Sequence, residues 1–243
     1  PLTAPCLSVV WRFIQERRKT LNKSPSPGGS GRRDRAKRVI SAAVKLFVRR
    51  GYEAVSLDEI AMTAAIETDV LIADFGDKEA VAIAMMDQVQ YQVLEPLVKK
   101  IADAHATPHG KLIGFINGLS SIAVRKADFM LLVVRFSMDF KGRDDRLENR
   151  CRLINSQLVK IVDGIIGMGA MRGTFRTDIE RSEIATIIVA GLTGMILEWW
   201  RRGEAVEGVK VTRAFRRIVM RGLEDSGRKD QYAEGAHFPG HHP

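Results

Sequence analysis

The stretch SLDEIAMTAAIETDVLIADF, residues Ser56–Phe75, predicts two short helices separated by a tight turn. Its first four residues form a capping-box pattern, in which the Ser56 hydroxyl accepts a hydrogen bond from the third helical amide and Glu59 accepts one from the Ser56 amide. The first helix therefore begins at Leu57, and the turn falls at residues 64–66. Two helices joined in this way form a helix-turn-helix, the arrangement that places its second helix in a groove of DNA.

The charge of this region is unusual for a surface that faces DNA. Residues 51–80 contain one basic residue, Lys78, and eight acids, a net charge of −7: Glu53, Asp58, Glu59, Glu67, Asp69, Asp74, Asp77 and Glu79. A unit like charge at about 4 Å costs roughly 1 kcal/mol even in a water-like dielectric. By contrast, residues 1–50 contain thirteen Lys or Arg and two acids, so a net charge of +11 directly precedes the acidic helices.

The whole chain has the composition of a soluble globular protein with an excess of basic charge. It has 243 residues, of which 45% are hydrophobic and 28% charged, with a net charge of +9 and a pI near 9.8. This balance favours acidic partners, nucleic acid first. The two cysteines, Cys6 and Cys151, have no metal-ligand spacing and predict neither a zinc site nor a disulfide framework. The start of the chain has no signal-peptide pattern, and we expect a cytoplasmic protein.

Composition and periodicity divide the chain into four parts. Residues 1–31 form an N-terminal extension that ends in a Pro- and Gly-rich linker, Ser24–Gly31. We expect a helix-turn-helix DNA-binding domain at residues 32–78 and a ligand-binding and dimerisation domain at residues 79–225. Residues 226–243 are low in core-forming residues and are expected to be a disordered tail.

From Arg32 onward, apolar residues recur at three- and four-residue spacing, and no segment is typical of a strand. Gly51 follows the first helix where a left-handed cap is expected. Asp77 is placed to cap a longer helix, which Pro96 is expected to kink. The predicted fold class is all-α, with an N-terminal three-helix helix-turn-helix domain followed by a larger helical domain.

These residues resemble the tetracycline-repressor (TetR) family of bacterial transcription regulators, from about Arg35 to about Leu223. The resemblance is carried by four spaced motifs: Ile40-x-x-Ala43-x-x-Leu46-Phe47-x-x-x-Gly51-Tyr52, Ser56-x-x-Glu59-Ile60-Ala61, Phe75-x-Asp77-Lys78-Glu79-Ala80 and Gly173-Thr174-Phe175-Arg176-Thr177-Asp178. It implies a homodimer whose last two helices build a four-helix interface and whose middle helices enclose a ligand pocket. It also implies a repressor that is released from a double-stranded DNA operator by a small apolar or amphipathic effector.

The sequence departs from the family pattern where DNA would be read. Ala65 stands at the turn where the family usually has Gly, which is unfavourable if the backbone needs a positive φ. Glu67 replaces the usual Ser or Thr cap of the following helix, and Ile72 replaces an aromatic residue that commonly binds a phosphate. A second hypothesis therefore stays open: a degenerate relative with weak or lost DNA binding that acts as a dimeric ligand- or protein-binding module.

Candidate DNA contacts come from the basic arm and from the outward face of the helix pair. Cations of the arm would add phosphate contacts, each with a counterion-release term, and acids in the major groove can accept from cytosine N4. Lys78 can pair with a phosphate at the start of its helix. The predicted set is Arg32, Arg33, Arg35, Lys37, Ser56, Thr68, Asp69, Ile72, Ala73 and Lys78.

Apolar residues of the middle helices form the candidate effector site: Phe115, Phe129, Met130, Phe136, Cys151 and Met168. A packed core is the alternative for each, because aromatic and Met residues at helical spacing fill cores by default. Glycines in these apolar helices leave room for either a pocket or close helix contact: Gly118, Gly164, Gly167 and Gly169.

The last two predicted helices carry the candidate dimer interface, for which the alternative is an intrachain core: Ile187, Ile188, Gly191, Met195, Trp199, Phe215 and Ile218. The longest apolar run, Ile184–Trp200, is interrupted by polar residues and is too short to span a bilayer, so we interpret it as a buried helix. No catalytic triad, paired carboxylates or Gly-rich phosphate loop stands out. We expect no enzyme activity, no cofactor, no metal and no membrane partner.

Overall fold

The computed structural model describes residues 30–103, 107–143, 145–202 and 207–224, and these residues are helical with no strand among them. The helix-turn-helix end comprises α2 (Ser30–Arg50), α3 (Leu57–Ala64) and α4 (Thr68–Phe75). The larger part comprises α5 (Lys78–Val89), η1 (Gln90–Leu94), α6 (Glu95–Asp103), α7 (Pro108–Arg125), α8 (Ala127–Asp139), α9 (Arg146–Met171), α10 (Arg181–Arg202) and α11 (Gly208–Leu223). The prediction of an all-α fold with a helix-turn-helix is confirmed.

Local signals define the helix ends around the helix-turn-helix. The capping box is present: the Glu59 amide donates to the Ser56 hydroxyl at 3.2 Å, and the Ser56 amide donates to the Glu59 carboxylate at 2.9 Å. Gly51 has a φ of 85°, and the Ala80 amide donates to the Asp77 carboxylate at 2.7 Å. Ala65 has a φ of 54° and is the one non-glycine residue in the described chain with a positive φ. The expected caps and the expected strain at Ala65 are therefore confirmed.

Helix α2 begins at Ser30, so Ser30 and Gly31 belong to the first helix and not to the linker in which the sequence placed them. The remaining residues of the predicted extension, 1–29, and those of the predicted tail, 226–243, lie outside the described residues. The helix predicted to kink at Pro96 contains a five-residue π turn, η1, directly before Glu95. Because Pro96 has no N–H, the carbonyl one α-helical turn before it must accept from a later residue, which is the π-helical pattern.

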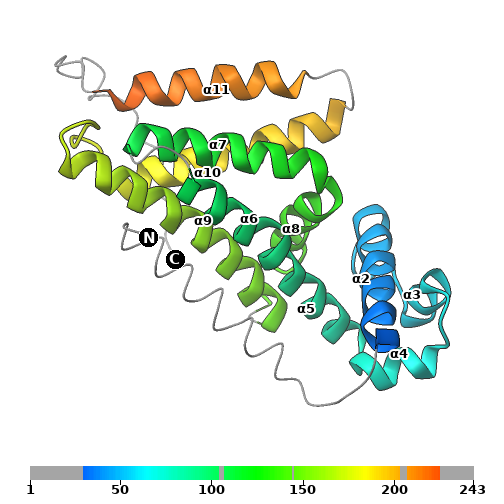
Figure 1. Ribbon diagram of the computed structural model, residues 1–243. Coiled ribbons are helices and arrows are strands. Elements are labelled where there is room, and N and C mark those ends of the chain that lie inside the picture. The colour runs from blue at the N-terminus through cyan, green and yellow to red at the C-terminus, as the bar shows by residue number, and fades with distance from the viewer. Residues whose placement is uncertain (1–29, 104–106, 144, 203–206, 225–243) are drawn as a thin grey trace.

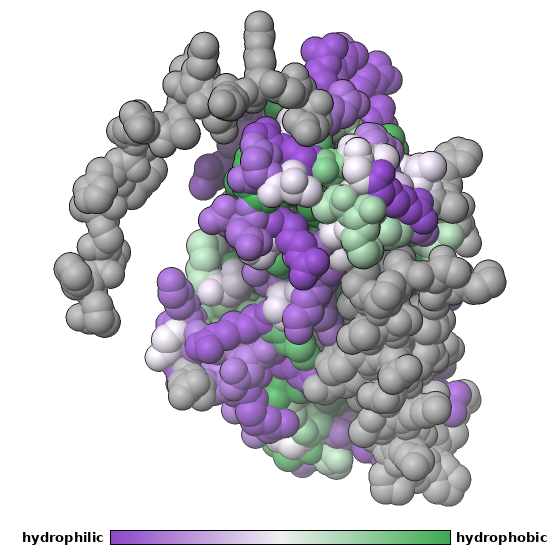
Figure 2. Space-filling view, turned by 90° about the vertical axis from the view of Figure 1, so that its left-hand side faces the viewer, coloured by the Kyte–Doolittle hydropathy of each residue, from purple (hydrophilic) through white to green (hydrophobic). Residues whose placement is uncertain are grey.

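The helices α2, α3 and α4 form one end of the molecule, and α5 leads from them into the larger domain (Figure 1). There α9 packs against α10 and α7, and α11 lies along α7 (Figure 1). Figure 2 shows the face opposite the helix-turn-helix, on which hydrophilic side chains predominate and apolar ones lie between them. The core runs without interruption from the helix-turn-helix end, at Phe47 and Leu71, to Ile161 and Leu192 in the larger domain.

Close helix contact fills the room beside the glycines of the larger domain. A methyl group at Gly169 would lie 1.9 Å from the Phe175 ring, and one at Gly118 would lie 2.9 Å from Leu97. At Gly167 the neighbour is the Arg181 side chain, at 3.1 Å. At these three positions the structure therefore favours close packing over a pocket.

Helix α10 is long and apolar enough to cross a membrane by length and composition, and 33% of the apolar window is buried within the chain. One of its faces packs on α9 through residues such as Ile184, Ile188 and Leu192. The opposite face is exposed at Ile187 and Trp200. The sequence interpretation of α10 as a buried helix is therefore correct for one face only.

Candidate DNA-binding and effector sites

The outward surface of α4 is the candidate reading surface. Leu71 is fully buried and anchors the helix, whereas Asp69, Ile72 and Ala73 are exposed. Glu67, which replaces the usual Ser or Thr cap, forms the N-cap of α4 without a side-chain hydrogen bond. Met62 of α3 is also exposed, so the surface combines two acids with a small apolar patch.

Most of the acids near this surface are engaged within the chain. Arg143 binds Glu53 at 2.6 Å, Arg50 binds Glu59, and Arg146 binds Glu79 at 3.7 Å. Thr68 donates to Asp58 at 2.8 Å, and Asp77 caps α5. Asp74 binds Arg32 at 2.9 Å and Arg35 at 3.1 Å, and its side chain is only 11% exposed. Six of the eight acids therefore have partners, and Glu67 and Asp69 have none among the described residues.

Glu59 shows the electrostatic consequence of these contacts. The Ser56 backbone amide and then the Arg50 guanidinium stabilise its charged form, which lowers the pKa of this carboxyl below its usual value. The charged carboxylate of Glu59 thus stabilises the start of α3 and, through Arg50, the contact between α3 and the end of α2. Cations pair with four of the eight acids, so the net charge of −7 overstates the acidity of this surface.

The basic arm and Lys78 are also partly engaged. Arg32 and Arg35 bind Asp74, and Arg33 and Lys37 lie on a cavity described below. Lys78 donates to the Tyr52 carbonyl at 3.1 Å and lies 4.3 Å from the centroid of the Tyr52 ring. The contacts of Arg32, Arg35 and Lys78 were not predicted from the sequence, because each joins residues that are 26 to 42 positions apart in the chain. The predicted phosphate contacts of these cations stay predictions.

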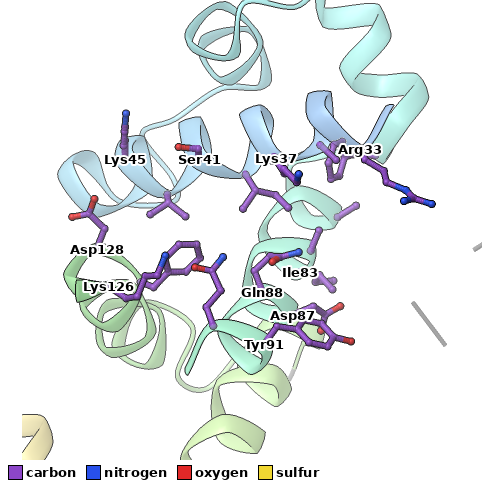
Figure 3. A pocket seen from close by; sticks show the side chains of 18 of the residues that line it. Arg33, Lys37, Ser41, Lys45, Ile83, Asp87, Gln88, Tyr91, Lys126 and Asp128 are labelled. Carbon is purple, nitrogen blue, oxygen red and sulfur yellow. The ribbon is translucent and has the colours of Figure 1, made fainter. Parts of the chain in front are cut away.

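A cavity of about 1120 Å³ lies between the DNA-binding helices and the larger domain. Figure 3 shows Arg33, Lys37, Ser41 and Lys45 on α2 along one side, with Lys126 and Asp128 at the start of α8. Asp87 and Gln88 of α5 and Tyr91 of η1 lie across from α2. We call this space the interdomain cavity.

A second cavity of about 490 Å³ lies between α7, α10 and α11. Its lining is mostly apolar and includes Leu192, Met195 and Trp199, with Asn117 and Arg216 as polar members. Asn117 accepts from Arg216 at 3.1 Å, so these two polar groups satisfy one another. The cavity borders the predicted dimer interface.

Of the residues predicted to bind an effector, Phe129 alone lines either cavity. Phe136 is fully buried in an aromatic cluster with Phe47, Tyr52 and Phe140, with neighbouring ring centroids 4.8 to 6.0 Å apart. The others are buried or packed against the core: Phe115, Met130, Cys151 and Met168. Burial raises the pKa of the Cys151 thiol to about 12. At these positions the structure has the packed core that was the alternative.

The predicted dimer residues divide into two groups. Ile187 and Ile218 are 66% and 71% exposed, and a methyl group at Gly194, between the exposed positions of α10, would meet nothing within 4 Å. Ile188 is buried, and a methyl group at Gly191 would lie 2.6 Å from the Phe215 ring. Met195 and Trp199 line the second cavity. Gly191 and Phe215 therefore join α10 to α11 within one chain, and their part in a dimer stays a prediction.

The fold and the exposed α4 define the class of this protein: a regulator with a helix-turn-helix DNA-binding end and a larger helical domain. The family model for bacterial regulatory proteins of the tetR family matches residues 39–85. The crystal structure of the MbdR regulator from Azoarcus sp. CIB is 30% identical, with a TM-score of 0.70, and the match covers 78% of this chain and 98% of that one. This chain belongs to the tetR family.

Two further proteins are similar to this chain, one in sequence and one in fold. The HTH-type transcriptional repressor KstR2 of Rhodococcus jostii RHA1 is 23% identical over 210 residues, which are 82% of this chain and 96% of that protein. The FadR regulator of Bacillus subtilis in complex with stearoyl-CoA has a TM-score of 0.67 at 18% identity, with 77% of this chain and 99% of that chain covered. The protein is a DNA-binding regulator of transcription of this family.

Proposed function

We propose that this regulator is a homodimeric repressor that leaves its operator when an amphipathic effector binds. The proposal of sequence-specific DNA binding rests on the exposed surface of α4. There Asp69, Ile72 and Ala73 are exposed, while Asp74 is paired with two arginines. In this proposal residues 32–78 bind DNA, and residues 79–225 bind the effector and form the dimer.

The chemistry of α4 suits bases more than phosphates. A carboxylate such as Asp69 can accept from the N4 amino group of cytosine, and Ile72 can pack against the methyl group of thymine. Thr68 donates to Asp58, which supports the first turn of α4 from α3. Affinity would come from cations around this surface, including Arg33, Lys37 and the symmetric copies in a dimer.

The dimer would use the exposed faces of α10 and α11. Isolated apolar side chains are ordinary on a surface, but Ile187, Trp200, Val211 and Ile218 are all exposed on these two adjacent helices. Open space beside Gly194 would let a partner helix approach closely. Two helix-turn-helix ends held in this way can contact successive major grooves.

The proposal of an amphipathic effector is supported by the ligand of a structural neighbour and by the lining of the interdomain cavity. FadR of Bacillus subtilis is described in complex with stearoyl-CoA, which joins an acyl chain to a group that bears phosphates. The interdomain cavity offers apolar residues such as Ile40 and Phe129 beside basic ones such as Lys45 and Lys126. We therefore propose an acyl-CoA as the effector class.

A binding selection from random duplex DNA at moderate salt tests the function. We expect one enriched sequence with two related half-sites, because a two-fold dimer presents two identical reading helices. Equal affinity for all sequences, or no binding, would overturn the repressor proposal. That result would favour the second hypothesis, a dimeric ligand- or protein-binding module.

A further inference from the structure

We propose that the interdomain cavity binds the phosphate-bearing part of an amphipathic effector and that this anion competes with Asp74 for the arginines of α2. The inference rests on the proposed function, because it assigns a site and a means of release to the effector. It concerns the elements that line the cavity: α2, α4, α5, η1, the end of α7, the start of α8 and the first residue of α9. The packed middle of the larger domain is not involved.

The first argument is charge. Seven basic residues and three acids line the cavity: Arg32, Arg33, Lys37, Lys45, Arg125, Lys126 and Arg146 against Asp74, Asp87 and Asp128. Two of the acids are paired, Asp74 with Arg32 and Arg35 and Asp87 with Arg150 at 3.0 Å. Two more of the cations also have acidic partners, Lys37 with Asp34 and Arg146 with Glu79. The excess of positive charge therefore comes from Arg33, Lys45, Arg125 and Lys126. Clustered cations of this kind attract an anion, and phosphate groups suit Arg and Lys as partners.

The second argument is shape and polarity. Apolar side chains line the cavity alongside the cations, among them Ile40, Val44, Ile83 and Phe129. A volume of about 1120 Å³ has room for a molecule larger than an inorganic anion. A ligand with an apolar body and phosphates matches the size, the apolar lining and the excess of positive charge of the cavity.

The third argument is the position of Asp74. It lies in the last turn of α4, lines the cavity and binds α2 through Arg32 and Arg35 at 2.9 and 3.1 Å. An anion bound beside Arg32 competes for that guanidinium and repels the carboxylate of Asp74. Both effects loosen the connection between α4 and α2. Ligand binding would thereby change the position of the reading helix, as a differential affinity for two conformers requires.

The binding site is tested first without DNA, on the full chain. Titration calorimetry with octanoyl-CoA, free coenzyme A and octanoate separates the two parts of the ligand. We expect octanoyl-CoA to bind most tightly and its affinity to fall as salt rises. The double variant Lys45→Gln with Lys126→Gln should bind it about 10-fold more weakly or worse. The control pair Lys141→Gln with Lys160→Gln, which removes two exposed cations away from the cavity, should match the wild type.

The coupling is tested with Asp74→Asn, which removes the charge that competes with the ligand. We expect octanoyl-CoA to bind this variant several-fold more tightly than the wild type, with circular dichroism as the check of folding. On the wild type, octanoyl-CoA should lower affinity for the selected operator by about 10-fold or more, within the usual range of allosteric coupling. A variant that does not fold leaves the lysine pair as the deciding measurement.

Several results would overturn the inference. These are no binding of octanoyl-CoA, equal binding of octanoate, an unchanged affinity in the cavity variant, or weaker binding to folded Asp74→Asn. Any of them leaves the proposed operator binding intact if the DNA selection yields an operator, and a lack of octanoyl-CoA binding also contradicts the proposed effector class. A selection that yields no operator overturns the proposed function. The two failures can be distinguished, because the selection measures DNA binding and the calorimetry measures ligand binding without DNA.

Discussion

Ala65 shows how one residue carries a cost that the family pattern avoids. Its φ of 54° is the left-handed conformation, which is unfavourable for L-residues with a Cβ by about 1–2 kcal/mol. We expect Ala65→Gly to stabilise the protein by about 1 kcal/mol, because glycine adopts this conformation without strain and its greater freedom when unfolded offsets part of the gain. Urea denaturation measures the change. Ala73→Gly, at an exposed helical position, should destabilise by a similar amount, and a loss of stability in Ala65→Gly would contradict the argument.

Asp69 is the residue of α4 that we expect to determine the preference for one base pair of the operator. We expect Asp69→Asn to move the preference at one base pair of each half-site from cytosine towards adenine, because an asparagine amide pairs with adenine whereas a carboxylate only accepts. The change should be worth about 1–3 kcal/mol. Repeating the DNA selection with this variant measures it. An unchanged sequence preference, with binding retained, would show that Asp69 does not contact a base.

At the scale of the element, Gly169 determines how α9 meets the link to α10. The Phe175 ring lies where a methyl group at this position would stand, at 1.9 Å. We expect Gly169→Ala to destabilise the chain by about 1–3 kcal/mol through overpacking, in spite of its better helix propensity. Gly31→Ala in α2, where the nearest atom is the end of the Arg35 side chain at 4.0 Å, should leave stability equal or higher. Thermal unfolding of the two variants distinguishes them, and equal melting temperatures would contradict the packing argument.

The loop between α2 and α3 supplies a prediction at high pH. Burial, followed by the negative charges of Glu79, Glu53 and Asp77, raises the pKa of Tyr52 to about 12. The neutral phenol is favoured in the folded state, so its contribution to stability is complete below pH 10 and is lost as the pH rises from about 10 to about 12. Urea midpoints of the wild type and Tyr52→Phe, compared across this range, measure the loss. A constant difference between the two proteins would contradict the raised pKa.

The sequence predicted those elements whose signals are local. Ser56 and Glu59 are three residues apart, and Gly51 and Asp77 act at the helix ends next to them, so capping rules located these features correctly. The ion pairs of Asp74 join residues 39 and 42 apart and left no local pattern. Phe129 and Phe136 have the same helical periodicity, yet one lines a cavity and the other is buried. Periodicity identifies an inward face without showing what lies opposite it.

At the scale of the whole molecule, the exposed face of α10 carries the dimer prediction. We expect Ile187→Glu to convert the dimer into a monomer at micromolar concentration, because the side chain is 66% exposed in one chain and would be buried between two. Met171→Glu, at the exposed end of α9, is the matched control and should remain dimeric. Light scattering measures both masses. A dimeric Ile187→Glu would place the interface elsewhere.

The aromatic cluster at the end of α2 has a mechanical consequence. Phe47 and Tyr52 pack on α8, where Arg135 also donates to the Val48 carbonyl at 3.2 Å, so this end of α2 is fastened to the larger domain. The interdomain cavity extends along α2 from Lys45, beside this attachment, to Arg32, which is about 22 Å from Phe47 along the helix. Helix α2 can thus rotate about its attachment at the aromatic rings, and its Arg32 end then moves furthest. A rotation of α2 by about 5° about this point moves its Arg32 end by about 2 Å. A small widening of the cavity would therefore displace α4, which is bound to this end of α2 through Asp74.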